Sequence, residues 1–265
     1  MNRFITAGAG LALIATPLVA TTATASDTTA ERKVAYSVTA KINKTMAIAD
    51  EDVVKIRGKV SPKAVGDKVV LQQRMDGKKK WAVSGKAKIK ANGTFLLKDE
   101  PSTAGTRFYR VLKPAAGSIK KGVSQELELV VYGWEKLGYR SRGPATNVFV
   151  TNAVIATENY AASIVTDKTG TPSSVEYTLG KKCLKLRASY ALTDDSASDS
   201  TGIAALKVDG NVAFASGLAI GQLVEDHEVN ITDAFRISYE LTATATAADK
   251  VSRVAVATPE VLCTK

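Results

Sequence analysis

The sequence has few of the residues on which enzyme active sites and metal centres depend. It contains one histidine, His227, and two cysteines, Cys183 and Cys263, among 265 residues. His227 lies in VEDHEV, where it reads as a strand surface residue, and it cannot by itself support a Ser-His-Asp set. Two isolated cysteines give no metal-binding spacing, and there is no glycine-rich phosphate loop. We therefore expect no catalytic residues, no metal and no cofactor.

Long apolar runs are also scarce, and the clearest one lies at the N-terminus. Arg3 precedes an apolar run from Ile5 to Ala20, and small residues follow it. This pattern predicts a secretory signal peptide over residues 1–26 and a flexible mature N-terminus over 27–32. A membrane anchor is the alternative, but Pro17 interrupts the run, which is short for a span of about 20 residues. We expect a secreted, extracellular or envelope-associated protein, not stably inserted in a membrane after cleavage.

Export bears on the two cysteines. Outside the cytoplasm nothing keeps thiols reduced, so Cys183 and Cys263 are expected to form a disulfide. Such a bond would tie the C-terminal strand back onto the middle of the chain.

Charge is distributed unevenly. Residues 33–132 contain 21 Lys and Arg against 9 Asp and Glu, a net charge of +12, whereas residues 133–265 contain 13 against 15, a net charge of −2. The basic half suggests an anionic partner surface, such as a cell-envelope polymer or acidic lipid, and nucleic acid is not expected for an exported chain. The alternative is a lysine-rich solvated surface.

The N-terminal half carries strand signals every eight to twelve residues, and no amphipathic helix competes with them. Seven short segments rich in β-branched and aromatic residues are separated by turn signals such as Asp76-Gly77 and Asn92-Gly93. This spacing predicts an antiparallel β-sandwich of immunoglobulin type over residues 33–132. The half has no cysteine pair, so its stability must come from packing.

The same residues resemble the Ig-like domain repeated in secreted and surface proteins of Gram-positive bacteria. The resemblance rests on Gly58, Pro62, Gly66, the strand Leu71–Arg74, Trp81, Gly93 and the strand Tyr109–Val111. It implies a spacer or adhesive unit and brings no catalytic residues.

The C-terminal half is organised around SVEYTLGKKCLKLRASYALTDD, residues 174–195. Val175, Tyr177 and Leu179 alternate with polar residues, and a second alternating segment follows the Gly-Lys-Lys turn, which predicts a β-hairpin. Further strand signals lead to the C-terminus. We expect a linker and domain start over residues 133–146 and a jelly-roll β-sandwich, galactose-binding-like, over 147–265. The fold class is thus all-β with two sandwich domains.

This half resembles the NPCBM-like domain, a carbohydrate-binding module of bacterial glycoside hydrolases. The positions that carry the resemblance are Tyr177, Leu179, Lys182, Asp194, Asp195, Val208, Asp209, Gly210 and Phe214. Cys183 replaces the usual aromatic residue after the Gly-Lys turn and departs from the pattern. The resemblance implies carbohydrate binding.

Sugar recognition needs an aromatic ring to stack on a pyranose face and polar groups to fix hydroxyls. The candidates are Tyr160, Asp194 and Asp195. Two other interpretations remain open for the acidic residues: a solvated turn, or a calcium site that includes Asp199.

The sequence therefore predicts a non-catalytic, secreted two-domain protein whose C-terminal module binds carbohydrate and whose basic Ig-like module is a spacer or envelope-attachment unit. The alternative is a structural or adhesive β-sandwich protein that contacts other proteins without binding sugar. The oligomeric state does not follow from the sequence.

Overall fold

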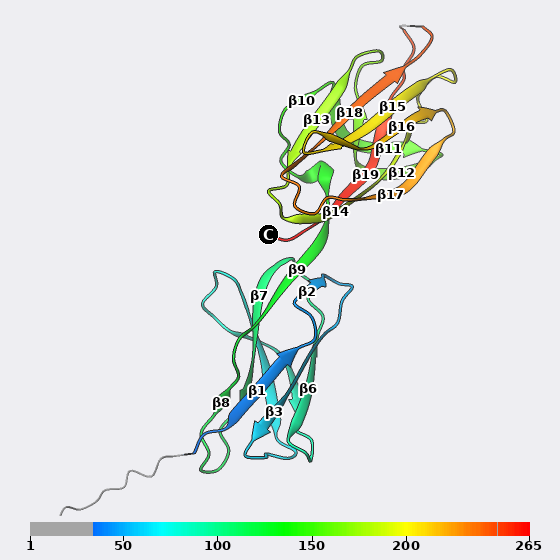
Figure 1. Cartoon of the computed structure of the whole chain (residues 1–265). Coiled ribbons are helices and arrows are strands. Elements are labelled where there is room, and N and C mark those ends of the chain that lie inside the picture. The colour runs from blue at the N-terminus through cyan, green and yellow to red at the C-terminus, as the bar shows by residue number, and fades with distance from the viewer. Residues whose placement is uncertain (1–33, 248) are drawn as a thin grey trace, which may run out of the picture. The chain divides into compact units, whose positions relative to one another are not determined.

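The computed structural model describes residues 34–247 and 249–265 (Figure 1). The predicted signal peptide and mature N-terminus, residues 1–32, lie outside the described residues. The described chain is all-β, with one 3-10 helix, η1 (Leu137–Tyr139), and several sheets. None of its helices has the length and apolar character needed to cross a membrane.

Strands lie where the alternating segments predicted them. The N-terminal half contains β1 (Ser37–Ile42), β2 (Met46–Ile48), β3 (Val54–Ser61), β4 (Lys68–Met75), β5 (Ala82–Lys88), β6 (Thr94–Asp99), β7 (Gly105–Lys113), β8 (Gly122–Val123) and β9 (Leu127–Lys136). The C-terminal half contains β10 (Ala145–Thr146), β11 (Val148–Ile155), β12 (Glu158–Thr166), β13 (Ser173–Thr178), β14 (Cys183–Leu192), β15 (Thr201–Val208), β16 (Asn211–Ala219), β17 (Leu223–Asn230), β18 (Arg236–Thr244) and β19 (Val254–Cys263). The short strands β2, β8 and β10 were not predicted, and β10 lies in the segment expected to be a linker.

The N-terminal strands form two layers around one apolar cluster. One sheet has the order β1-β3-β6, and the facing strands have the order β9-β7-β4-β5. Alternate residues of both point inward, so that Val54 and Ile56 of β3 pack with Leu71 of β4 and Val111 of β7 in a buried cluster. This period-two burial is the packing of a β-sandwich.

Strand β9 continues through the boundary predicted between residues 132 and 133. Its first part, Leu127–Val131, pairs with β7, and its second part, Gly133–Lys136, pairs with β19 at the end of the chain. Leu137, which follows β9, is fully buried in the apolar cluster of the C-terminal half.

The C-terminal strands also form two layers. The first sheet has the order β10-β13-β18-β15-β16, and the second joins β11, β12, β19, β14 and β17. Tyr177 and Tyr239 from the first sheet pack with Leu186, Tyr190 and other residues of the second in one buried cluster. A smaller cluster, which includes Ala153, Ile155, Ala191 and Ala255, lies among β11, β14 and β19.

The hairpin predicted between residues 174 and 195 is wrong. β13 pairs with β10 and β18, whereas β14 pairs with β17 and β19, so the two strands belong to different sheets. The connection between them is held by the chain before β18, since Leu179 N donates to Phe235 O at 2.8 Å and Lys181 N to Ala234 O at 3.0 Å. The alternation of apolar and polar residues shows which face of a strand is buried, but it does not show which strand pairs with it. Both β13 and β14 bury residues in the same core, so their patterns are the same whether or not they pair with each other.

The expected disulfide is present between Cys183 and Cys263. The two residues lie directly opposite each other in the β14–β19 pair and are 2% and 3% exposed. The bond therefore joins the last strand to the segment that carries the NPCBM-like pattern.

Candidate binding site

Asp194 and Asp195 follow the end of β14, and their side chains have different partners. The Asp194 carboxylate accepts hydrogen bonds from Ala156 N at 2.7 Å and from Thr157 N at 2.8 Å. These amides belong to the turn between β11 and β12, where Ala156 and Thr157 adopt φ angles of 50° and 68°. Such angles are unfavourable for non-glycine residues. Asp194 thus stabilises the β11–β12 turn in a backbone conformation that Ala156 and Thr157 disfavour.

Asp195, the next residue in the chain, does not share these partners. Its carboxylate accepts a hydrogen bond from Thr193 Oγ1 at 2.5 Å and forms an ion pair with Arg253, the residue before β19. The Asp195 side chain is 53% exposed and the Arg253 side chain 30%. Both remain accessible to a ligand, which distinguishes Asp195 from Asp194.

A cavity of about 310 Å³ opens at Asp195 and Arg253. Phe149 and Asn152 of β11 contribute an aromatic ring and an amide, and the Arg253 guanidinium lies 5.9 Å from the centre of the Phe149 ring. One aromatic ring, one carboxylate, one guanidinium and one amide therefore surround a single space. We call this space the Asp195 cavity.

A smaller cavity of about 220 Å³ lies on the Asp194 side. Its walls include Ile155, Leu192, Ile220, Gln222 and Leu223. This cavity has no aromatic side chain, and its one carboxylate is that of Asp194, which already binds two backbone amides.

Tyr160 is not brought to the Asp195 cavity. It is a half-buried residue of β12 and packs against the smaller apolar cluster. Burial raises its pKa above the usual value, and the nearby carboxylates of Glu158, Glu225 and Asp226 add to the effect. Tyr160 thus lies beside acidic residues other than the predicted pair.

Asp199 does not join Asp194 and Asp195 in a cation site. Its carboxylate accepts hydrogen bonds from Thr246 and Lys250, and the Lys250 bond is the main cause of its lowered pKa. Among the described residues, no group of three or more His, Cys, Asp and Glu side chains has the proximity needed to hold a metal ion.

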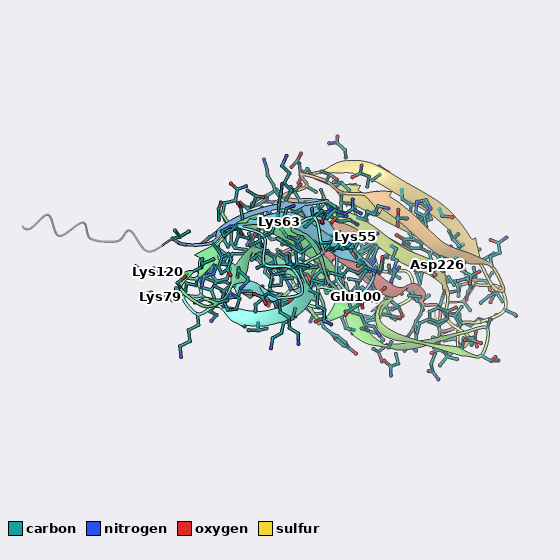
Figure 2. All side chains as sticks on the ribbon, turned by 90° about the horizontal axis from the view of Figure 1, so that it is seen from below. Lys55, Lys63, Lys79, Glu100, Lys120 and Asp226 are labelled. Carbon is teal, nitrogen blue, oxygen red and sulfur yellow. A yellow bond between two sulfur atoms is a disulfide. The ribbon has the colours of Figure 1, made fainter. Side chains whose placement is uncertain are left out.

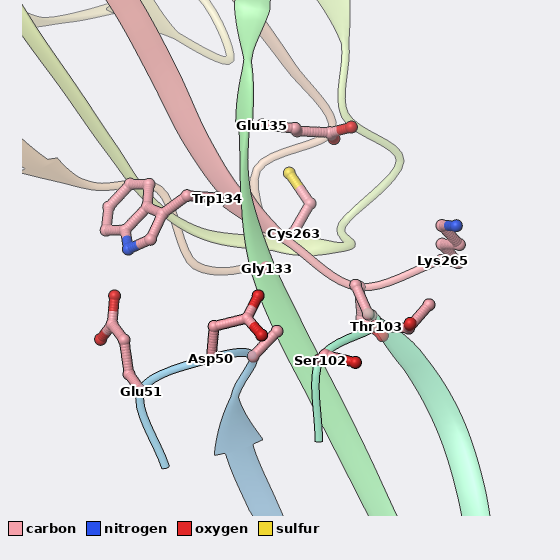
Figure 3. Close-up of a pocket in the computed structure, with 12 residues that line it drawn as sticks. Asp50, Glu51, Ser102, Thr103, Gly133, Trp134, Glu135, Cys263 and Lys265 are labelled. Carbon is pink, nitrogen blue, oxygen red and sulfur yellow. The ribbon is translucent and has the colours of Figure 1, made fainter. Parts of the chain in front are cut away.

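A third cavity, of about 480 Å³, contains Trp134 together with the carboxylates of Asp50, Glu51 and Glu135 (Figure 3). The guanidinium of Arg187 lies 4.0 Å from the centre of the Trp134 ring, and Glu135 pairs with Arg140. One face of the indole is therefore already occupied by a cation.

No protein-family model matches the chain, and no curated protein matches it. The resemblances to Ig-like and NPCBM-like domains therefore stay predictions from the sequence. The cavities are distinguished by the chemistry of the side chains that line them.

The sequence named Asp195 as a candidate and did not single out Phe149, Asn152 and Arg253, which line the same cavity. All three lie within or beside segments predicted as strands, and β11 and β19 are about 100 residues apart in the chain. They meet because β12 pairs with both strands. No local pattern in the sequence carries that pairing.

Proposed function

We propose that the chain is an exported, non-catalytic binding protein that takes carbohydrate in the Asp195 cavity. In this proposal the C-terminal half is a jelly-roll module of the NPCBM-like kind. The basic N-terminal half is an Ig-like unit that spaces the module or attaches it to an anionic envelope polymer. The observation that carries the proposal is the set of groups around one cavity: Phe149, Asn152, Asp195 and Arg253.

These groups match the two sides of a sugar ring. The Phe149 ring offers an apolar surface for the C–H face of a pyranose, while Asp195 accepts hydrogen bonds from hydroxyls and Arg253 and Asn152 donate them. The cavity volume of about 310 Å³ is at the lower end of the range of roughly 300–1,000 Å³ seen for small-molecule sites, so a short saccharide fits best.

The acidic pair supports binding over hydrolysis. Glycoside cleavage requires two carboxyl groups, one acting as an acid and the other as a base or nucleophile. Both oxygens of Asp194 accept backbone N–H groups, and Asp195 is paired with Arg253. Asp194 therefore contributes to the turn, and Asp195 is a fixed acceptor.

A glycan array with the exported full-length chain tests this function. We expect binding to a restricted set of glycans, and we expect Phe149→Ala with Arg253→Gln to weaken it more than about tenfold, because stacking and a charged donor are both lost. The matched control is Phe235→Ala with Arg236→Gln, since the Arg236 guanidinium also lies over an exposed phenylalanine, 5.8 Å from its ring centre. Absence of binding to every glycan, or equal loss in the control, refutes the proposal.

One observation favours the alternative of a protein-contacting β-sandwich. β16 is the terminal strand of its sheet, its sequence NVAFASGLA has no charged residue, and Val212 is 62% exposed. A long uncharged edge strand is a site where another strand can add. A negative glycan array together with self-association that Ala215→Lys abolishes would favour this alternative.

A further inference from the structure

Five basic side chains share the outward face of the β1-β3-β6 sheet. The face comprises Lys41 of β1, Lys55, Arg57 and Lys59 of β3, and Lys98 of β6, and we call it the cationic face. The inward positions of the same strands are buried and apolar, such as Val54 and Ile56. Lys55 is labelled in Figure 2, on the N-terminal half of the chain. One sheet face thus concentrates a quarter of the basic residues of the N-terminal half.

The strand register places like charges directly opposite each other on this face. Lys41 is the partner of Arg57 across β1 and β3, and Lys55 is the partner of Lys98 across β3 and β6. Like charges at directly opposed positions destabilise a sheet. These pairs therefore cost the sheet stability, as does the opposed pair Lys68 and Lys88 of β4 and β5.

The C-terminal sheets show the usual arrangement. There, Arg187 is directly opposite Glu228 on one side and Glu260 on the other. Lys185 and Lys207 form ion pairs with diagonal neighbours, Glu228 at 2.6 Å and Glu240 at 2.5 Å. Within the described part of the chain, no ion pair involves a member of the cationic face. Asp99, the one acidic residue in β1, β3 and β6, instead accepts hydrogen bonds from Tyr109 and Ser84. The positive charge of the face is left for a ligand to neutralise.

A cavity of about 650 Å³ adjoins the cationic face. Its walls include four of the five cations, Lys41, Lys55, Arg57 and Lys59, and the hydroxyl-bearing Thr39 and Thr94. The lining contains no acidic residue. The charge is therefore concentrated around a hollow, where the potential is stronger than over a convex surface.

We propose that the cationic face binds a linear phosphate-bearing polymer. Lys55, Arg57 and Lys59 repeat every second residue, which spaces them by about 6.7 Å along β3. An extended chain of anions that runs along the strand can meet these cations in succession. Lys41 and Thr39 approach from the neighbouring strand, so that one anion receives donors from several directions. A phosphate within such a polymer has two non-bridging oxygens, which its tetrahedral geometry directs to either side of the chain, while the two oxygens of a carboxylate lie in one plane.

This inference deepens the proposed envelope-attachment role of the basic half and rests on it. It is independent of the Asp195 cavity, because no residue of the cationic face lines that cavity. Loss of polymer binding and loss of glycan binding are therefore separate outcomes in the same protein.

The test measures binding of linear polyphosphate to the exported full-length chain. The variant Lys41→Gln, Arg57→Gln, Lys59→Gln removes three exposed cations from the face. The control, Lys68→Gln, Lys86→Gln, Lys88→Gln, removes three exposed cations from β4 and β5 and also contains an opposed like-charged pair, Lys68 and Lys88. The two variants have the same net charge, so a difference between them reports position.

We expect the face variant to bind polyphosphate more than about tenfold more weakly than the wild type, and the control to change by less than about threefold. Wild-type binding should weaken steeply with salt. Because the face variant removes repulsion between Lys41 and Arg57, its thermal midpoint should not fall, which separates lost binding from lost folding.

Equal weakening of polyphosphate binding in the face variant and the control would contradict the location of the binding site on the cationic face. Polygalacturonate binding as tightly as polyphosphate would overturn the choice of phosphate. Polyphosphate binding that is insensitive to salt would overturn the electrostatic basis of the site.

Discussion

Loss of the disulfide between Cys183 and Cys263 should destabilise the C-terminal half strongly. The bond closes a loop of 80 residues. In the chain-entropy description a loop of that length restricts the unfolded chain by about 4.5 kcal/mol, and measured losses for native disulfides are roughly 2–5 kcal/mol. The two residues are already cross-strand partners in β14 and β19. The folded strands need not move when the bond is broken, so the loss should arise mainly in the unfolded chain.

The two tryptophans allow unfolding in urea, followed by fluorescence, to be measured separately for each half of the chain. Trp134 lies on β9 opposite Leu262, one residue from Cys263, whereas Trp81 precedes β5 in the N-terminal half. Trp81→Phe leaves Trp134 as the reporter near the disulfide, and Trp134→Phe leaves Trp81 as the matched control. With an m value of about 2 kcal/mol per molar urea, reduction should lower the Trp134 midpoint by about 2 M.

The control reporter decides whether the halves unfold together. If they unfold independently, the Trp81 midpoint should stay in place on reduction, because residues 34–132 contain no cysteine. If β9 couples them, both midpoints should fall. A Trp134 midpoint that does not move beyond the error of the extrapolation refutes the reasoning, and the variant Cys183→Ala with Cys263→Ala should repeat the effect of reduction.

Two further predictions concern individual side chains of the C-terminal half. Asp194→Ala should lower the free energy of unfolding by about 1–2 kcal/mol, because two backbone amides lose a charged acceptor. Adding Thr157→Gly should recover part of this loss, because glycine adopts the positive φ angle of residue 157 without strain. Unfolding in urea measures both effects. Burial raises the pKa of Tyr190 to about 12, and that of Tyr239 well above 10.0, so stability should be complete below pH 10 and fall as the pH rises toward 12. Tyr190→Phe with Tyr239→Phe should flatten this fall, and an unchanged alkaline profile would contradict the assignment.

The positions of the strands could be predicted from the sequence, but the pairing of β13 could not. Alternation of Val175 and Tyr177 with polar residues identifies a half-buried strand because the side-chain period of a strand is two. The partner of that strand depends on contacts with β18, about 60 residues further along the chain. A hairpin is the shortest connection between neighbouring strands, and here the four residues between β13 and β14 instead cross between two sheets.

The candidate site could likewise be predicted only in part from the sequence. Asp195 could be found because acidic residues gather in a turn, but the separate roles of Asp194 and Asp195 depend on which chain segments approach that turn. The β11–β12 turn reaches Asp194, and the start of β19 brings Arg253 to Asp195. Phe149 has the alternating context of any strand residue, and only the order of strands places it beside Arg253.

The charge of the N-terminal half illustrates why composition and register must be read together. A count of residues gives a net charge of +12 for residues 33–132 and does not distinguish a dispersed surface from a concentrated one. The strand register shows that the charge is concentrated, because it places Lys41 opposite Arg57 and Lys55 opposite Lys98 on one face of the sheet. A slip of one residue would turn these cations into the core, so the burial of Val54 and Ile56 fixes the cationic face as firmly as it fixes the sheet. The same apolar contacts that stabilise the sandwich therefore hold its repelling charges in place.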